Sequence, residues 1–343
     1  MIQKILFLVY ALLVPMIPAF SADLAGCQPQ LEAAICYGLP TEHWAMTSED
    51  LVQNLKSFQE RKCRPTPVKI KQTLIDIYQR YPKEIQQAFC AIKKVFITSG
   101  DVSFGALADY YFDVSSVKAE ETLSGHFFSG RPVGFVLEIS EKNRFKGESA
   151  SAYVTRVFQA RFGKAPKKSP HIPTADYETP FAENGALATT IVHEIGHMLA
   201  RSHKVTSTYF LPFSESKWSK ISFKLDGDYY LRHANENLLM DIKSKLLSDR
   251  DVMPITSFLK KSGLATLYGA TSPQEDFAEF FMLMYYGNLK WKIGGQTILD
   301  FQGELKTNES FKAKAEIIKN LMSLPAPFSL QNRGTVSGEI GVM

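Results

Sequence analysis

The sequence predicts an α+β fold, in which a small helical domain that carries all the cysteines precedes a larger domain of mixed strands and helices. Cys27, Cys36, Cys63 and Cys90 all fall before residue 91. Residues 28–94 show the apolar spacing of short helices, and runs of β-branched and aromatic residues follow from residue 95 onward. The change in pattern places the boundary between the two domains near residue 94.

Composition and charge narrow the range of functions. The chain has 343 residues, of which 45% are hydrophobic and 22% charged, so it is long enough for a sizeable core and more than one domain. Its formal net charge is only +4, and no dense stripe of Lys and Arg is present, which argues against a nucleic acid partner. We expect a signal peptide at 1–21, a helical domain at 22–94, a main domain at 95–324 and a flexible tail at 325–343.

The elements follow from local patterns. In the N-terminal domain, helices are expected over 29–37, 48–62, 68–81 and 82–95. In the main domain, strands are expected over 95–98 and 134–139, whereas 106–112 and 152–162 fit a strand or a helix. Residues 163–180 contain four Pro and are expected to form a loop, and helices are expected from Pro273 and near 309–322.

The first residues are typical of a cleavable leader. Lys4 precedes a short apolar run that Pro15 and Pro18 interrupt, and the small residues around Ser21 fit a cleavage site before Ala22. The run is shorter than the roughly 20 residues that a membrane span needs, so we expect no stable span after cleavage. The protein is therefore expected to be secreted or periplasmic.

Cys27 has two interpretations. The segment Leu24 to Cys27 resembles the lipobox of bacterial lipoproteins, in which the Cys is lipidated, but Asp23 departs from that pattern. Lipidation would leave three Cys and one odd thiol. An even number of Cys in an exported chain favours two disulfides, with three possible pairings.

The apolar segment 185–200, GALATTIVHEIGHMLA, is predicted to form a buried helix. Its large aliphatic side chains recur every four residues, at Leu187, Ile191, Ile195 and Leu199. Buried His and Glu side chains are costly unless they are paired or bind a metal ion. The His and Glu residues of this segment therefore need partners.

His193, Glu194 and His197 form an H-E-x-x-H pattern on this helix. Residues four apart share a helix face, so both imidazoles can bind one ion, and zinc (Zn2+) is the metal expected for such ligands. Glu194 lies one step around the helix, where a general base can take a proton from a metal-activated water. The pattern predicts zinc-dependent hydrolysis.

Two residues compete as the third metal ligand. His203 has the spacing of metzincin proteases, but Ala200 stands where that family needs Gly for a left-handed turn, a conformation that costs about 1–2 kcal/mol with a Cβ. Glu275 and Glu279 are one turn apart on the helix that is expected to begin at Pro273. We favour Glu275 and keep His203 as the alternative.

The H-E-x-x-H segment followed by Tyr268, Glu275 and Glu279 resembles the gluzincin metalloproteases related to anthrax lethal factor and the Pro-Pro endopeptidases. The resemblance covers residues 187–203 and 266–286. It implies a zincin-like catalytic domain, with a small mixed sheet, an active-site helix and C-terminal helices.

The resemblance also implies roles for single residues. His193, His197 and Glu275 would bind zinc, Glu194 would be the catalytic acid and base, and Tyr268 would donate a hydrogen bond to the oxyanion. Glu279 would orient a ligand imidazole. A protein or peptide substrate would bind along an edge strand, for which residues 134–139 (Gly134 to Ile139) are the candidate.

The leading interpretation is an exported zinc endopeptidase. The alternatives are a metzincin-type protease with His203 as ligand, a hydrolase of cell-wall peptides, and a zinc-containing binding protein without turnover. The combination of His193, Glu194, His197, Tyr268 and Glu275 argues against the last.

Overall fold

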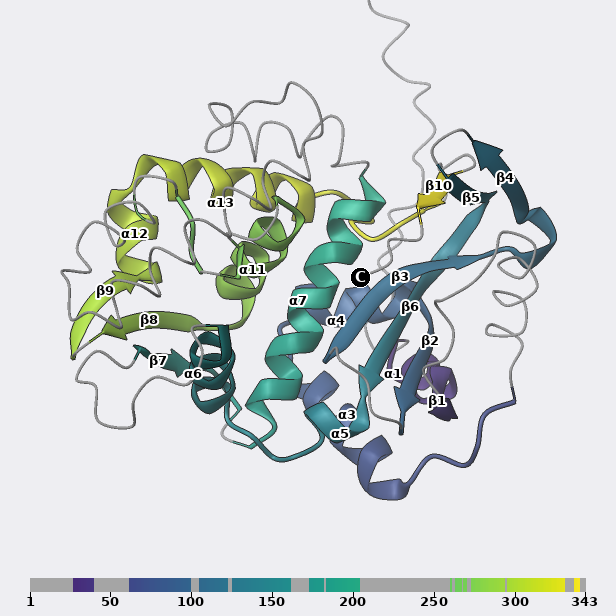
Figure 1. Ribbon diagram of the computed structural model, residues 1–343, viewed down its shortest axis with the longest axis horizontal. Helices are drawn as coiled ribbons and strands as arrows, with labels where there is room; N and C mark the ends of the chain where they lie inside the picture. The colour runs from purple at the N-terminus through teal and green to yellow at the C-terminus, as the bar shows by residue number, and fades with distance from the viewer. Residues whose placement is uncertain are drawn as a thin grey trace, which may run out of the picture.

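One long helix, α7 (Gly185–Ser202), runs through the middle of the molecule. The computed structural model describes residues 27–39, 62–99, 105–122, 125–161, 173–181, 183–203, 260, 263–266, 268–269, 273–293, 295–330 and 336–339. Figure 1 shows a four-stranded sheet on one side of α7, and on the other side three helices, α11 (Pro273–Tyr286), α12 (Phe301–Thr307) and α13 (Glu309–Met322). Among the described residues, no helix is long and apolar enough to cross a membrane.

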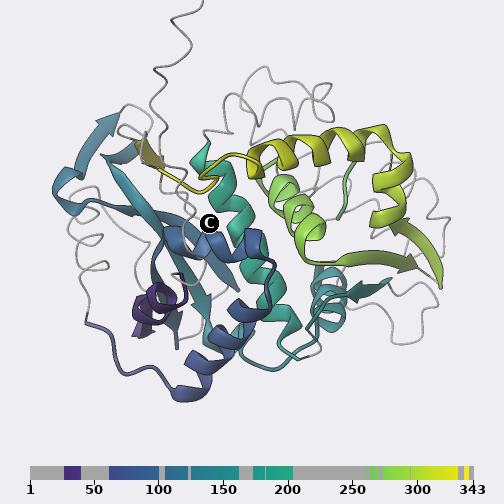
Figure 2. The same cartoon turned by 180° about the vertical axis from the view of Figure 1, so that it is seen from behind.

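The four-stranded sheet has the order β1-β2-β6-β3. Strands β1 (Ile35–Leu39), β2 (Ile92–Thr98) and β6 (Pro132–Ser140) are parallel, and β3 (Ala106–Phe112) runs antiparallel to β6. The pattern of residues 106–112 fitted either a strand or a helix. In the structure they form β3, one of the two edge strands of this sheet. Helices α1 (Cys27–Ala34), α3 (Val68–Arg80) and α4 (Lys83–Ala88) lie on the same side of α7 as this sheet, as the rear view in Figure 2 shows.

Two predicted N-terminal helices end earlier than expected. The helix predicted over 29–37 stops at Ala34 and continues as β1, and that predicted over 82–95 gives way to a 3-10 turn (Phe89–Ala91) and then β2. Strand β2 is rich in β-branched residues and pairs on both edges, an environment that favours extended chain over helix. The predicted boundary at residue 94 thus falls inside β2.

Two disulfides hold the N-terminal segments on this sheet. Cys27 pairs with Cys90, and Cys36 pairs with Cys63, which selects one of the three possible pairings. The Cys27 side chain is fully buried and its sulfur is bonded to Cys90, so this state of the chain is incompatible with lipidation at Cys27.

The remaining elements form two smaller sheets and the helices between them. One antiparallel sheet has the order β10-β5-β4 and contains β4 (Lys118–Thr122), β5 (Gly125–Gly130) and β10 (Val336–Glu339), and a 3-10 turn (Val114–Ser116) precedes it. The other has the order β7-β8-β9 and contains β7 (Pro173–Glu178), β8 (Asn288–Ile293) and β9 (Gln296–Asp300). Helices α5 (Glu141–Arg144) and α6 (Ala150–Arg161) connect β6 to β7.

Two expectations of irregular structure are wrong in part. The predicted loop 163–180 contains β7, whose Pro173 stands at the first position of the strand, where a missing N–H is tolerated. The predicted flexible tail 325–343 begins with Phe328 and Leu330, which are buried in the core, and residues 336–339 pair with β5. Apolar side chains hold residues 325–330 in place, and a sheet edge holds residues 336–339.

One hydrophobic core joins the segments before and after residue 94. It includes Leu31 and Leu74 from the N-terminal helices, Ile195 from α7, and Phe280 and Phe311 from the C-terminal helices. The predicted signal peptide at 1–21 lies outside the described residues, as does nearly all of the helix predicted over 48–62. The helices predicted from Pro273 and near 309–322 are confirmed as α11 and α13.

Candidate metal centre

Helix α7 crosses α11 at close range because of one glycine. A Cβ on Gly196 would lie 2.9 Å from the Cα of Ala278 and 3.2 Å from the Phe281 ring. The backbone of α11 occupies the space that any other side chain at 196 would need. The glycine inside the H-E-x-x-H pattern therefore permits the contact that brings the acidic face of α11 to the histidines.

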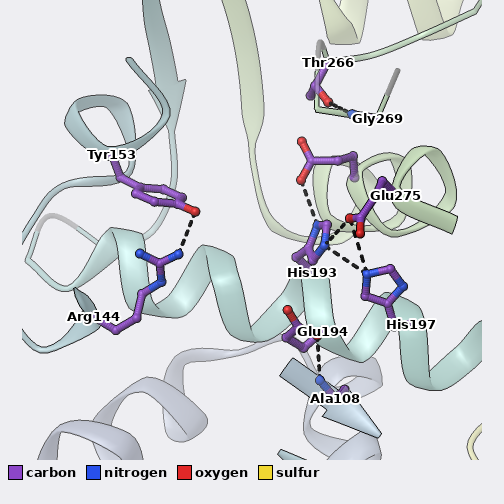
Figure 3. A network of polar contacts seen from close by, with 10 residues as sticks. Ala108, Arg144, Tyr153, His193, Glu194, His197, Thr266, Gly269 and Glu275 are labelled. Atoms are coloured by element: carbon purple, nitrogen blue, oxygen red, sulfur yellow. Dashed lines mark hydrogen bonds and ion pairs between the residues drawn. The ribbon is translucent and has the colours of Figure 1, made fainter. Parts of the chain in front are cut away.

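Three side chains from these two helices converge on one point. The Nε2 atoms of His193 and His197 are 3.1 Å apart, and the Oε2 atom of Glu275 lies 3.0 Å from the first and 3.5 Å from the second. Figure 3 shows the three side chains turned toward one another. His193 is buried, His197 and Glu275 are half-buried, and together they form a group that could hold a metal ion.

Glu279 determines how His193 presents its ring. The Glu279 Oε1 atom lies 2.8 Å from Nδ1 of His193, one helical turn from Glu275. A carboxylate at this distance favours the proton on Nδ1, which leaves a lone pair on Nε2. That lone pair faces the Glu275 carboxylate and the Nε2 atom of His197, an arrangement that is stable only with a proton or a metal ion between these atoms.

The charges at the site favour a cation. Burial lowers the pKa of His193, but hydrogen bonds that its ring donates to the Glu275 and Glu279 carboxylates raise that pKa well above its usual value. Burial likewise raises the pKa of Glu275, yet the two facing imidazoles lower it well below its usual range. Negative carboxylates thus draw a positive charge to this point, which a proton or a metal ion can supply.

Glu194 points away from α11, toward the four-stranded sheet. Its Oε2 atom accepts a hydrogen bond of 2.8 Å from the backbone N–H of Ala108 in β3 (Figure 3). Glu194 is buried, with 6% of its surface exposed. One carboxylate oxygen is therefore fixed by the edge strand, and the sequence gives no signal for this bond because its donor is backbone.

Tyr268 is brought to the same place by a short turn. The backbone N–H of Gly269 donates to the Thr266 hydroxyl, and the Tyr268 ring centroid lies 5.6 Å from that of His193. A Cβ on Gly269 would lie 3.1 Å from the Cα of Asp276, so this turn packs on the first residues of α11.

His203 lies apart from this group. Helix α7 continues past Ala200 to Ser202, and Nε2 of His203 is hydrogen-bonded to the Pro327 carbonyl of the C-terminal segment. The chain does not turn back toward the ligand histidines at Ala200. The structure thus brings together His193, His197, Glu275, Glu279 and Tyr268, and leaves out His203.

Residues 134–139 are not an edge strand, and the prediction of a substrate-binding edge there is wrong. Strand β6 pairs with β2 on one side and with β3 on the other, so both of its edges are occupied. The edge strand beside α7 is β3, which also carries the Ala108 N–H that binds Glu194.

A buried ion pair next to Glu275 in the chain was not predicted. Lys314 of α13 and Asp276 of α11 are 0% and 1% exposed, and they form a salt bridge. The Lys314 ammonium also donates to the Gly263 carbonyl at 2.9 Å. Lys314 falls on the apolar face of an amphipathic helix, and a lysine at such a position is the only signal that the sequence offers.

Comparisons of the chain with known protein families, with curated proteins and with solved structures found no match. The geometry of the site is therefore the basis for any functional conclusion.

Proposed function

We propose that this protein is a zinc-dependent endopeptidase of the gluzincin type. The observation that carries the proposal is the convergence of His193, His197 and Glu275 from two helices on one point. The Glu194 carboxylate follows the first of these ligands on α7. Two imidazoles and one carboxylate are the ligand set of several hydrolytic zinc enzymes, in which the fourth position is left for water.

The spacing of the donor atoms supports zinc as the metal. In a tetrahedral site with bonds of about 2.1 Å, neighbouring ligand atoms lie roughly 3.4 Å apart. The three separations here are 3.0, 3.1 and 3.5 Å. Glu279 on Nδ1 of His193 is the type of outer partner that metal-bound imidazoles require.

In this proposal the bound zinc supplies a water of lowered pKa and polarises the substrate carbonyl. Glu194 takes the proton of the attacking water and passes it to the leaving amine. The Ala108 N–H fixes one Glu194 oxygen, which directs the other to the proton. Tyr268 donates its phenolic proton to the developing oxyanion.

The substrate is a polypeptide that pairs with the outer edge of β3. A backbone edge recruits an extended peptide through main-chain hydrogen bonds, and β3 is an edge strand that is hydrogen-bonded to Glu194 of the proposed site. Two disulfides among the described residues support an oxidising compartment, in keeping with the predicted leader. We accordingly propose that the protein is secreted or periplasmic.

The decisive experiment compares the full mature chain with its Glu194→Gln variant on a peptide library, with bound zinc measured in both. We expect the wild-type chain to cleave peptides and Glu194→Gln to retain zinc but lose activity by about 10²–10⁴-fold, the usual contribution of a general base. Equal activity in the two proteins refutes the mechanism. Zinc binding without turnover in either protein supports a zinc-containing binding protein instead.

Two further comparisons distinguish this proposal from a metzincin-type protease and from a cell-wall hydrolase. Glu275→Ala should abolish zinc binding, and His203→Ala should leave it intact, because the His203 ring is bonded to the Pro327 carbonyl. The opposite result identifies a metzincin-type site. Activity confined to cell-wall peptides, with none on the general library, identifies the cell-wall hydrolase.

A further inference from the structure

The outer edge of β3 is occupied next to the proposed catalytic base. The Ala108 N–H donates to Glu194, and the Ala108 carbonyl accepts a hydrogen bond from the Arg201 guanidinium. Both groups of Ala108 therefore point away from β6, toward α7. Ala108 offers the edge acceptor closest to Glu194, where an incoming peptide would place its own N–H.

Arg201 lies on the face of α7 that carries the catalytic groups. It follows His197 by four residues and Glu194 by seven, so the three share one side of the helix. Its side chain is 32% exposed, and its guanidinium lies 5.9 Å from the centre of the Tyr110 ring. The guanidinium is thus held beside the edge of β3, about one helical turn beyond His197.

The guanidinium has donors to spare. It forms a long ion pair with Asp109 at 4.0 Å, which is beyond hydrogen-bond distance, and the Asp109 Oδ1 atom already accepts from the Tyr110 N–H. Within the part of the chain that the structure describes, the bond to Ala108 is the one hydrogen bond that this guanidinium makes. Four N–H groups of a cation that lies beside the edge of β3 therefore remain for a ligand.

A peptide that pairs with β3 needs the Ala108 carbonyl that Arg201 now holds. The exchange is favourable when the peptide brings a carboxylate, because a charged acceptor binds guanidinium more strongly than a neutral carbonyl does. A neutral peptide takes the carbonyl and leaves the guanidinium with only water and the Asp109 carboxylate at 4.0 Å to replace that bond. Charge at Arg201 therefore discriminates between substrates that pair equally well with the strand.

We propose that Arg201 is a specificity-determining residue, which binds a carboxylate of the substrate close to the scissile bond and releases the edge of β3 for pairing. The proposal rests on the proposed peptidase function and names its substrate class, acidic peptides. The carboxylate belongs to an Asp or Glu side chain or to the C-terminus of the peptide.

The test uses matched peptides and three variants of the full mature chain. Peptides cleaved by the wild type are compared with versions in which each Asp or Glu is replaced by Asn or Gln, and with versions that carry a C-terminal amide. We expect kcat/KM to fall about 10- to 100-fold when the recognised carboxylate is neutralised, the effect of losing one charged hydrogen bond. The position of that loss separates a side-chain carboxylate from a terminal one.

Arg201→Gln should lower kcat/KM for the acidic peptide by a similar factor and remove the preference over its neutral counterpart. Arg201→Lys should restore the preference in part, because it keeps the charge but lacks the guanidinium fork. The matched control is Arg131→Gln, an exposed arginine paired with Asp113, which should change neither activity nor preference. Equal losses on acidic and neutral peptides, or no preference in the wild type, overturn the proposal.

Binding to the Glu194→Gln background keeps this test separate from the test of function. Calorimetric titration with the acidic and neutral peptides, with and without Arg201→Gln, reports carboxylate binding in the absence of turnover. Arg201-dependent binding without wild-type cleavage supports the acidic site and rejects the peptidase. Cleavage without any preference for acidic peptides supports the peptidase and rejects the role of Arg201.

Discussion

The two sides of α7 are held together by different means. On the side of the four-stranded sheet, two disulfides join segments 27 to 63 residues apart. On the other side, α11, α12 and α13 pack through the rings of Phe280, Phe301 and Phe311 and around the fully buried Lys314–Asp276 pair. All four cysteines of the chain lie on the first side.

Both sides contribute to the candidate site, and they contribute different parts. The C-terminal side provides Glu275, Glu279 and Tyr268, while the sheet side provides the Ala108 N–H that holds Glu194. A destabilising substitution on the C-terminal side should therefore disturb the geometry of the proposed metal ligands. A destabilising substitution on the sheet side should disturb the position of Glu194, the proposed base. The candidate site therefore depends on two kinds of stabilisation that meet at α7: disulfides on the sheet side, and aromatic packing with a buried ion pair on the other side.

The largest effect is expected from Lys314→Met. Removing the ammonium leaves a buried Asp276 carboxylate without its partner, which costs about 3–5 kcal/mol in unfolding free energy. Urea unfolding measures this loss. The double variant Lys314→Met/Asp276→Leu, which removes both charges, should recover most of it, and a double variant as unstable as the single one contradicts this account.

Removal of the Cys27–Cys90 disulfide should be nearly as severe. The bond closes a loop with a sequence separation of 63 residues, for which chain entropy gives about 4 kcal/mol. The double variant Cys36→Ala/Cys63→Ala, whose loop separation is 27 residues, should lose less. Thermal unfolding of both double-alanine proteins, without reductant, gives the comparison, and the reverse order argues against the entropic explanation.

Glu138 on β6 should make the sheet side sensitive to pH. Burial raises the pKa of this carboxyl from 4.5 to about 7, and it is 2% exposed. The folded state binds the Glu138 proton more tightly than the unfolded state does. The contribution of Glu138 to the free energy of unfolding is therefore most favourable at low pH, and about 3 kcal/mol of it is lost as pH rises from 4.5 to about 7. The difference in unfolding free energy between wild type and Glu138→Gln should grow across this window, and a constant difference refutes the shift.

The smallest effect is expected where α3 meets α7. The Tyr81 hydroxyl donates to the Ala188 carbonyl at 2.8 Å in a buried position, so Tyr81→Phe should cost about 1 kcal/mol. Tyr78 is a matched control, because it is also buried and its hydroxyl has no hydrogen-bond partner among the described residues. In chemical denaturation, Tyr78→Phe should leave the free energy of unfolding unchanged or raise it. If both variants lose the same amount, the Tyr81 hydrogen bond is not the cause of the loss.

Local patterns predicted the helices of the site better than the sheet around it. The regular apolar spacing of α7 and the register of Glu275 and Glu279 in α11 repeat within a few turns, so the chain itself displays them. Residues 92–95 looked helical because their burial depends on β1 and β6, which are distant in sequence. The edge strand was assigned wrongly for the same reason: whether a strand lies at an edge depends on its partners, and residues 134–139 pair with two strands whereas 106–112 pair with one.

Helical spacing was enough to identify the two histidines, the acid between them and the acidic helix that completes the group, because it fixes which side chains share a face. The sequence left open whether Glu275 or His203 lies beside those histidines. In the structure it is Glu275, because the close backbone contact at Gly196 brings α11 next to α7, whereas His203 is bonded to Pro327. Tertiary structure also decided the disulfide pairing, the edge strand and the backbone partners of Glu194 and Arg201. These depend on contacts between segments far apart in the chain, which no local pattern encodes.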